Sequence, residues 1–231
     1  IILDSDGYKI SHWKQYPADT RRVVSYIEAR GNGYEHNPEL RDTLFFGIQG
    51  FIEDYLMQPV TQEDIEEARW YFDQHGVQPW NEQGWQTIVD EFNGYLPLKV
   101  RSVREGTRVP FKNVLVTVEN TDDRFYWLPT YVETAILRAV WYGTSVATIS
   151  RDIKDVILKY HELTSDEDPF GVNFKLHDFG CRGASSLESA GIGGAGHLVN
   201  FMGTDTIPAL RWIRNVYGDE SVQGFSIPAS E

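Results

Sequence analysis

The alternation of hydrophobic and polar positions predicts strands and helices in irregular order over the first 160 residues. β-Branched residues that alternate with polar ones are typical of strands, and they occur in residues 23–30, 98–103 and 114–120. Apolar residues at helical spacing predict helices in residues 45–57, 130–143 and 145–163. A further helix is expected between Thr61, which can cap its N-terminus, and Gly76, which can end it.

The segment at residues 164–171 separates this part from a more regular one, because it is acidic, contains Pro and Gly, and lacks apolar periodicity. Beyond it, strands are predicted in residues 174–180, 197–203 and 224–230, and helices in residues 184–196 and 207–218. Repeated units of strand, loop and helix imply parallel strands joined by right-handed crossovers. In a barrel of such units, the chemistry lies in the loops that follow the C-terminal ends of the strands.

The glycines Gly191, Gly193 and Gly196 have the G-x-G-x-x-G spacing of a dinucleotide-binding loop. That loop requires a strand before the glycines and a helix after them, so that the helix N-terminus points at the phosphates. Here the predicted helix comes first and the predicted strand follows, so we reject this interpretation. We expect the small residues to let the helix lie close to its sheet, and the last glycines to end it.

Composition narrows the range of partners and compartments. The 34 acidic and 21 basic residues give a formal charge of −13, so we expect neither nucleic acid nor a membrane as a partner. The single cysteine, Cys181, excludes an intrachain disulfide and favours a reducing, cytoplasmic location. The sequence begins without Met and stops within a predicted strand, so we expect it to be part of a longer chain that carries further catalytic groups beyond residue 231.

Polar and aromatic residues cluster where the predicted parallel strands end. They are Asp178, Phe179 and Arg182 after the first strand, Thr204 and Asp205 after the second, and Ser226 on the third. An arginine binds phosphate bidentately and an aromatic ring stacks on a flat ligand, so these residues could form a pocket for a flat polar ring and a phosphate. Residue types alone leave a structural alternative open, with Phe179 in the core, Arg182 paired with Asp178, and Asp205 capping the next helix.

Five segments resemble the nicotinamide phosphoribosyltransferase family, in the same order and with similar spacing. They read DSDGYKISHWKQYP, RSVREGTRVPFKNVLVTVENTD, WYGTSVATISR, KLHDFGCRGASSLESAGIGGAGHLVNFMGTDT and GFSIPASE. The resemblance covers essentially the whole chain and corresponds to the N-terminal half of a family member. It implies an α/β fold, with a mixed α/β N-terminal domain at residues 1–165 that contributes to a dimer interface. Residues 166–231 would form the first βα units of an irregular α/β barrel that is incomplete in this chain.

The resemblance also implies an activity. Family members transfer the phosphoribosyl group of 5-phosphoribosyl 1-pyrophosphate (PRPP) to nicotinamide, which gives nicotinamide mononucleotide and pyrophosphate in NAD salvage. They use Mg²⁺, and they couple ATP hydrolysis through a phosphohistidine that would follow Glu231 directly. They are homodimers with shared active sites. Nicotinamide, PRPP and ATP are therefore the expected small-molecule partners, and no metal ligand is assigned within residues 1–231.

The resemblance implies that nicotinamide lies between Phe179 and Tyr8 of the partner subunit, with Asp205 at its carboxamide. A carboxylate accepts hydrogen bonds from the carboxamide NH₂ group but repels the carboxylate of nicotinic acid. Asp205 therefore predicts a preference for nicotinamide. The alternatives are a nicotinate phosphoribosyltransferase, or a non-catalytic binding or dimerisation module of the same fold.

Further roles follow from the resemblance. Arg182 and the partner's Arg30 would contact phosphates, and Ser226 would line the channel that leads to the ring. Two positions depart from the usual family pattern. Gly7 stands where a serine usually precedes the tyrosine, and Cys181 replaces the usual aromatic residue. We interpret Cys181 as a small filler and not a nucleophile, because no base is adjacent to it in the sequence.

Overall fold

The computed structural model describes residues 1–31, 37–76, 78–218, 220–221 and 224–227. The chain divides into two compact units, and each unit is built from three segments. Unit 1 contains Ile1–Ala29, Gly50–Val103 and Val114–Ala139, and unit 2 contains Arg30–Gln49, Arg104–Asn113 and Val140–Glu231. The predicted division at residues 165 and 166 lies within unit 2. That division marks the point where the irregular order of elements gives way to repeated units of strand, loop and helix. It stays a prediction about the domains of the whole protein.

Unit 1 combines strands with helices, as the hydrophobic pattern predicts, and the structure adds that its sheet is antiparallel. Its strands are β1 (Val24–Glu28), β5 (Val114–Asn120) and β3 (Leu98–Ser102), in the order β1-β5-β3. The helices are α2 (Gln62–His75), α3 (Glu82–Phe92) and α4 (Leu128–Tyr131). The core gathers around Trp85, whose ring centroid lies 5.1 Å from that of Trp127 and 5.2 Å from that of Tyr131.

The predicted ends of α2 are confirmed. The Thr61 hydroxyl accepts a hydrogen bond from the Asp64 amide, and the Asp64 carboxylate accepts one from the Thr61 amide. This reciprocal pair satisfies two donors that a helix N-terminus otherwise leaves free. Gly76 follows the last turn with a φ of 72°, a left-handed conformation that glycine adopts without strain.

The helix predictions around Gly143 are wrong in one respect. Residues 130–143 and 145–163 do not form two helices, because one helix, α5 (Glu133–Thr164), runs through Gly143. This glycine serves packing: a Cβ atom there would lie 3.1 Å from the Phe46 ring and 3.2 Å from Ile192. Earlier in the chain, the predicted helix at 45–57 appears as α1 (Ile48–Phe51) followed by a π-helical turn (Ile52–Leu56).

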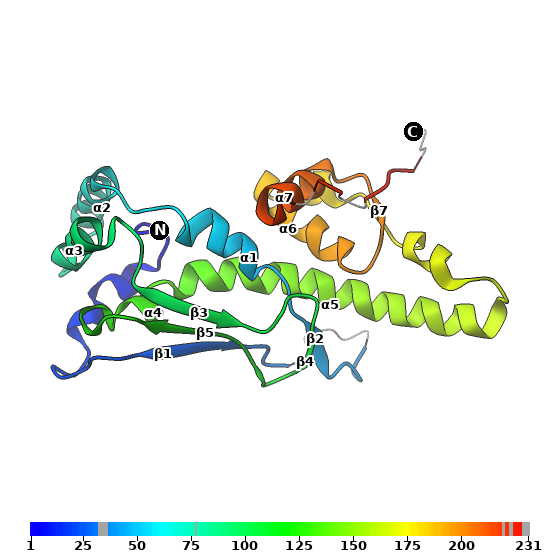
Figure 1. The fold of residues 1–231 in the computed structure, drawn as a ribbon, viewed down its shortest axis with the longest axis horizontal. Helices are drawn as coiled ribbons and strands as arrows, with labels where there is room; N and C mark the ends of the chain where they lie inside the picture. The colour runs from blue at the N-terminus through cyan, green and yellow to red at the C-terminus, as the bar shows by residue number, and fades with distance from the viewer. Residues whose placement is uncertain (32–36, 77, 219, 222–223, 228–231) are drawn as a thin grey trace. The chain divides into compact units, whose positions relative to one another are not determined.

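Unit 2 contains the parallel strands that the regular pattern predicts, although they are short. They are β6 (His177–Asp178) and β7 (Gly203–Thr204), with helices α6 (Leu187–Leu198) and α7 (Ile207–Tyr217) after them. A parallel bridge joins Gly203 to Phe225, within the third predicted strand, of which residues 228–230 lie outside the described residues. A separate antiparallel pair is formed by β2 (Asp42–Leu44) and β4 (Arg108–Pro110). The α/β class is confirmed (Figure 1).

The glycine-rich segment lies inside α6 and does not end it, so that part of the prediction is wrong. Ser186 caps the helix, which continues through Gly196 to Leu198, so residues 197 and 198 are helical and not part of a strand. The glycines therefore cannot form a loop ahead of a helix, and the rejection of a dinucleotide site stands. A Cβ atom added to Gly194 would lie 2.6 Å from the Ala209 Cβ. A Cβ atom added to Gly196 would lie 2.8 Å from the Gly143 carbonyl oxygen. The small residues thus allow α6 to approach both α5 and α7.

This close approach predicts that Gly196→Ala lowers the free energy of unfolding by about 1 kcal/mol. Alanine favours a helix over glycine by about 1 kcal/mol, but the new Cβ would press on a backbone carbonyl of α5, and overpacking costs about 1–3 kcal/mol. Denaturant unfolding of the full-length protein measures the change. Gly171→Ala is the control, because a Cβ there has no atom within 4 Å. Equal stability of the two variants would contradict the packing argument.

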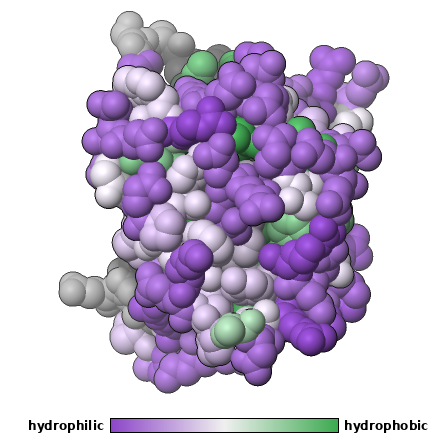
Figure 2. Space-filling model, turned by 90° about the vertical axis from the view of Figure 1, so that its left-hand side faces the viewer, coloured by the Kyte–Doolittle hydropathy of each residue, from purple (hydrophilic) through white to green (hydrophobic). Residues whose placement is uncertain are grey.

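The surface is mostly polar where Figure 2 displays it, with hydrophobic side chains in small patches. This agrees with the formal charge of −13. Among the described residues, no helix is both long and apolar enough to span a membrane.

Candidate functional site

The candidate site lies in unit 2, at the ends of β6 and β7. The two strands pair in parallel, with His177 opposite Gly203 and Asp178 opposite Thr204. The residues that follow them, Phe179 and Asp205, therefore leave the same edge of the sheet. The Asp205 amide also donates to the Asp178 carbonyl oxygen at 2.9 Å, which extends the contact by one residue.

Two side chains hold the Asp205 carboxylate in this site. The Ser226 hydroxyl donates to its Oδ1 at 2.5 Å, and His177 Nε2 forms a hydrogen bond with its Oδ2. The hydrogen bond from Ser226 and then that from His177 lower the pKa of Asp205 below its ordinary value. The side chain is 34% exposed, so the ionised carboxylate still faces solvent. This arrangement presents a fixed negative charge with lone pairs available to an outside donor.

These contacts predict the effect of Ser226→Ala on pH dependence. Loss of the hydroxyl donor should raise the pKa of Asp205 towards its ordinary value. In the folded wild-type protein, Asp205 stays ionised until the pH falls to its lowered pKa. The variant has a higher pKa, so Asp205 should become protonated at a higher pH. The pH titration of the Asp205 carboxyl, followed by NMR in the full-length protein, should move to higher pH in the variant. A midpoint at the wild-type pH would contradict this.

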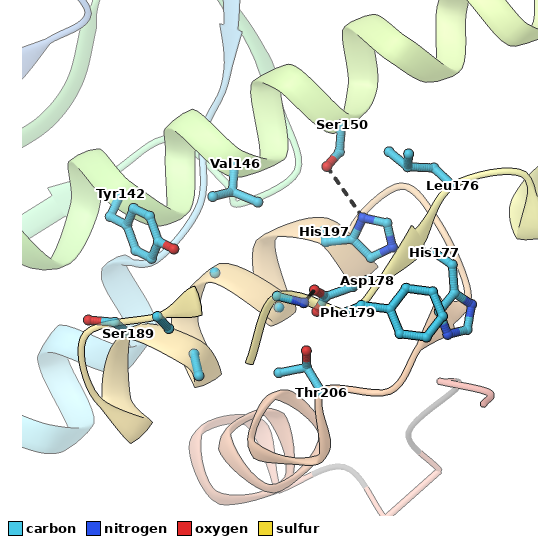
Figure 3. Close-up of a pocket in the computed structure, with 15 residues that line it drawn as sticks. Tyr142, Val146, Ser150, Leu176, His177, Asp178, Phe179, Ser189, His197 and Thr206 are labelled. Atoms are coloured by element: carbon cyan, nitrogen blue, oxygen red, sulfur yellow. Dashed lines mark hydrogen bonds between the residues drawn. The ribbon is translucent and has the colours of Figure 1, made fainter. Parts of the chain in front are cut away.

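Phe179 is not a core residue, so the structural alternative is wrong for this position. Its side chain is 53% exposed. The ring packs against the His177 imidazole, with centroids 4.5 Å apart and planes tilted by 40° (Figure 3). An exposed aromatic ring held by a neighbour in this way can stack on a flat ligand.

The capping alternative for Asp205 is also wrong. Helix α7 begins after Thr206, and no side chain caps it. The Asp205 carboxylate faces Ser226 and His177, while its backbone carbonyl accepts from the Ile207 amide at 3.1 Å. The carboxylate is therefore directed to the site and not to the helix.

Arg182 lies on the loop after β6, within the 3-10 helix Gly180–Gly183, and is exposed. Asp178 shapes the start of this loop, because its carboxylate accepts from the Gly180 amide at 2.7 Å and from the Thr204 hydroxyl at 3.3 Å. Arg182 thus follows Phe179 closely on a turn that Asp178 organises. Its phosphate contact stays a prediction.

The other two predicted residues lie elsewhere in the chain. Tyr8 belongs to unit 1, in the 3-10 helix Gly7–Lys14, where it is 63% exposed and its hydroxyl donates to Asp6 at 3.4 Å. Arg30 is an exposed residue of unit 2. Both roles concern a partner subunit, so they stay predictions.

A cavity of about 450 Å³ adjoins the site between α5, α6 and the loop after β6 (Figure 3). His197 forms part of its wall and is buried, with Nε2 3.0 Å from the Gly203 carbonyl oxygen and Nδ1 3.5 Å from the Ser150 hydroxyl. Burial lowers the pKa of His197. His177 and His197 are thus both hydrogen-bonded within the fold.

Sequence reasoning missed His177 as a residue of the site. The sequence alone gave no usable signal, because the glycine that faces His177 is identified only by the register of β6 and β7. A Cβ atom on Gly203 would lie 2.6 Å from His177 Nδ1, so only glycine leaves room for the ring. The imidazole then contacts both Phe179 and Asp205, the two residues that the sequence does identify.

The residues described by the structure contain no group of three or more His, Cys, Asp or Glu side chains that could hold a metal ion. Mg²⁺ prefers oxygen ligands in octahedral geometry, and it often shares them with substrate phosphates.

Matches to two family models point to one class of protein, the pyridine phosphoribosyltransferases, and the fold agrees with that class. The structure resembles the crystal structure of human nicotinic acid phosphoribosyltransferase with a TM-score of 0.56, at 15% identity, over 97% of this chain and 39% of that one. Residues 174–231 match the nicotinate phosphoribosyltransferase (NAPRTase) family model, and residues 1–100 match the model for the N-terminal domain of nicotinamide phosphoribosyltransferase.

Curated relatives identify the family within that class. A nicotinamide phosphoribosyltransferase of Xanthomonas campestris is 47% identical over 231 residues, which cover 100% of this chain and 47% of that protein. Proteins of the same name from Acinetobacter baylyi and Mycoplasma genitalium are each 31% identical, over 98% and 89% of this chain and 46% and 49% of theirs. The chain belongs to the nicotinamide phosphoribosyltransferase family. It spans about half the length of these relatives.

Proposed function

We propose that the full-length protein transfers the phosphoribosyl group of PRPP to nicotinamide, giving nicotinamide mononucleotide and pyrophosphate in NAD salvage. The observation that carries the proposal is that His177 contacts both an exposed Phe179 ring and an Asp205 carboxylate whose ionised form two hydrogen bonds favour. Phe179 offers a stacking surface for a pyridine ring, and Asp205 offers acceptors for a carboxamide NH₂. Membership of the nicotinamide phosphoribosyltransferase family supports the same reaction.

The proposed reaction requires these residues mainly to bind and align the substrate. The pyridine nitrogen is neutral and nucleophilic, so it needs no general base, and alignment with the ribose carbon is the main requirement. Phe179 and Tyr8 of the partner subunit would hold the ring on its two faces, while Asp205 sets its rotation. Cleavage of the ribosyl bond places negative charge on pyrophosphate, and arginine donors stabilise such charge. Arg182 and the partner's Arg30 are the candidates, and Ser226 would line the route to the ring.

The remaining parts of the proposal rest on family membership. We infer a homodimer with shared active sites, a requirement for Mg²⁺, and coupling to ATP hydrolysis. A cytoplasmic location is inferred from the single cysteine, which suits a reducing compartment.

Product analysis by mass spectrometry tests the proposal. The full-length protein is incubated with PRPP and Mg²⁺, with nicotinamide or nicotinic acid, and with or without ATP. We expect nicotinamide mononucleotide in strong excess over nicotinate mononucleotide, and more product with ATP. Nicotinate mononucleotide as the main product would support the alternative that the family match of residues 174–231 favours. The absence of both products would support a non-catalytic module.

A further inference from the structure

We propose that His177 is a positioning residue that fixes the Asp205 carboxylate for recognition of the pyridine carboxamide. This inference rests on the proposed function. The His177 side chain is 10% exposed, and its Nε2 forms a hydrogen bond with Asp205 Oδ2. The two residues lie on adjacent strand ends, so the contact is set by the pairing of β6 with β7.

Packing holds the imidazole in one orientation. On one side, Gly203 leaves room for the ring, since a Cβ atom there would lie 2.6 Å from Nδ1. On another side, the Phe179 ring packs against it, with centroids 4.5 Å apart. A ring held in this way makes a directional donor. His177 therefore links the ring that would stack on the substrate to the carboxylate that would bind its amide.

The two nitrogens of His177 have different surroundings. Nδ1 is buried and has no hydrogen-bond partner among the described residues, whereas Nε2 faces Asp205. A proton on Nδ1 would be buried without an acceptor, which favours the tautomer that carries the proton on Nε2. The function of the side chain thus depends on one donor, Nε2–H, and not on the imidazole as a whole.

This donor determines which lone pairs of Asp205 stay free. An ionised carboxylate has about four acceptor positions, of which His177 occupies one on Oδ2 and Ser226 one on Oδ1. Two donors on opposite oxygens stop rotation of the carboxylate and direct its remaining lone pairs to the exposed side. A carboxamide NH₂ then meets a carboxylate that is already oriented, so less conformational entropy is lost on binding.

The test compares His177→Gln with His177→Asn in the full-length protein. The glutamine amide nitrogen reaches about as far as Nε2, while the asparagine nitrogen reaches only to the place of Nδ1, where no acceptor lies. We expect His177→Asn to raise the KM for nicotinamide about tenfold, the usual size of one charge-assisted hydrogen bond. His177→Gln should restore most of this loss. The KM for PRPP should change little in both variants.

Controls separate the inference from stability and from the proposed function. His75→Asn alters an exposed histidine of unit 1 and should leave the kinetics unchanged. If His177→Asn does not fold, Gly203→Ala is used in its place. The new Cβ would clash with His177 Nδ1 and displace the imidazole from Asp205, which should raise the same KM. Equal KM values for the Gln and Asn variants, or an unchanged KM in Gly203→Ala, would overturn the inference. A wild-type protein without product would instead contradict the proposed function.

Discussion

Replacement of Asp205 by asparagine should bring the kcat/KM values for nicotinamide and nicotinic acid closer together, by about 10- to 100-fold. Asparagine has nearly the shape of aspartate but carries no charge, so it no longer repels the carboxylate of nicotinic acid. Its NH₂ group can also donate to that carboxylate. The Ser226 and His177 donors then compete for one amide oxygen, which weakens the orientation of the side chain for nicotinamide.

The measurement is the ratio of kcat/KM for the two pyridines at saturating PRPP in the full-length protein. Asp166→Asn is a suitable control, because Asp166 is exposed and lies in the same unit outside the site. The expected change concerns the ratio and not activity in general. If the ratio in Asp205→Asn equals the wild-type ratio, Asp205 does not determine specificity.

The elements that the sequence predicts well are those fixed by local chemistry. The Thr61 cap and the left-handed Gly76 depend on neighbours within four residues, and both are confirmed. The glycines of α5 and α6 illustrate the opposite case. Gly143 and Gly196 lie inside helices, and glycine is required at these positions because the neighbouring helix approaches too closely for a larger residue. A glycine at a helix end and a glycine at a helix contact look alike in a single sequence, so tertiary packing decides between them.

The candidate site shows the same division. Phe179, Asp205 and Ser226 could be placed together because parallel strands deliver their following residues to one edge, and the structure confirms the link between Asp205 and Ser226. His177 was not foreseen, since its role depends on the hydrogen bond to Asp205 and on space opposite Gly203. Neither feature follows from periodicity.

Replacement of Phe179 by alanine should raise the KM for nicotinamide by about 5- to 150-fold, which corresponds to about 1–3 kcal/mol of stacking between a base and an aromatic ring. The ring is 53% exposed, so its removal takes away a surface that a flat pyridine would cover. It also takes away the packing that holds the His177 imidazole. Phe179→Tyr keeps the aromatic face and should stay near the wild-type KM.

Steady-state kinetics of the full-length protein, with nicotinamide varied at saturating PRPP, measures this effect. Phe170→Ala is the matched control, because Phe170 is 62% exposed in the same unit, and the ring contact it makes is with Phe174. The loss of one exposed phenylalanine should not by itself alter the KM, and the melting temperatures of the two variants show whether stability differs. A KM for Phe179→Ala that matches the Phe170→Ala value would mean that Phe179 does not stack on the substrate. A large increase for Phe179→Ala alone, with recovery in Phe179→Tyr, would assign the binding energy to the aromatic face, because that face is what the tyrosine variant retains.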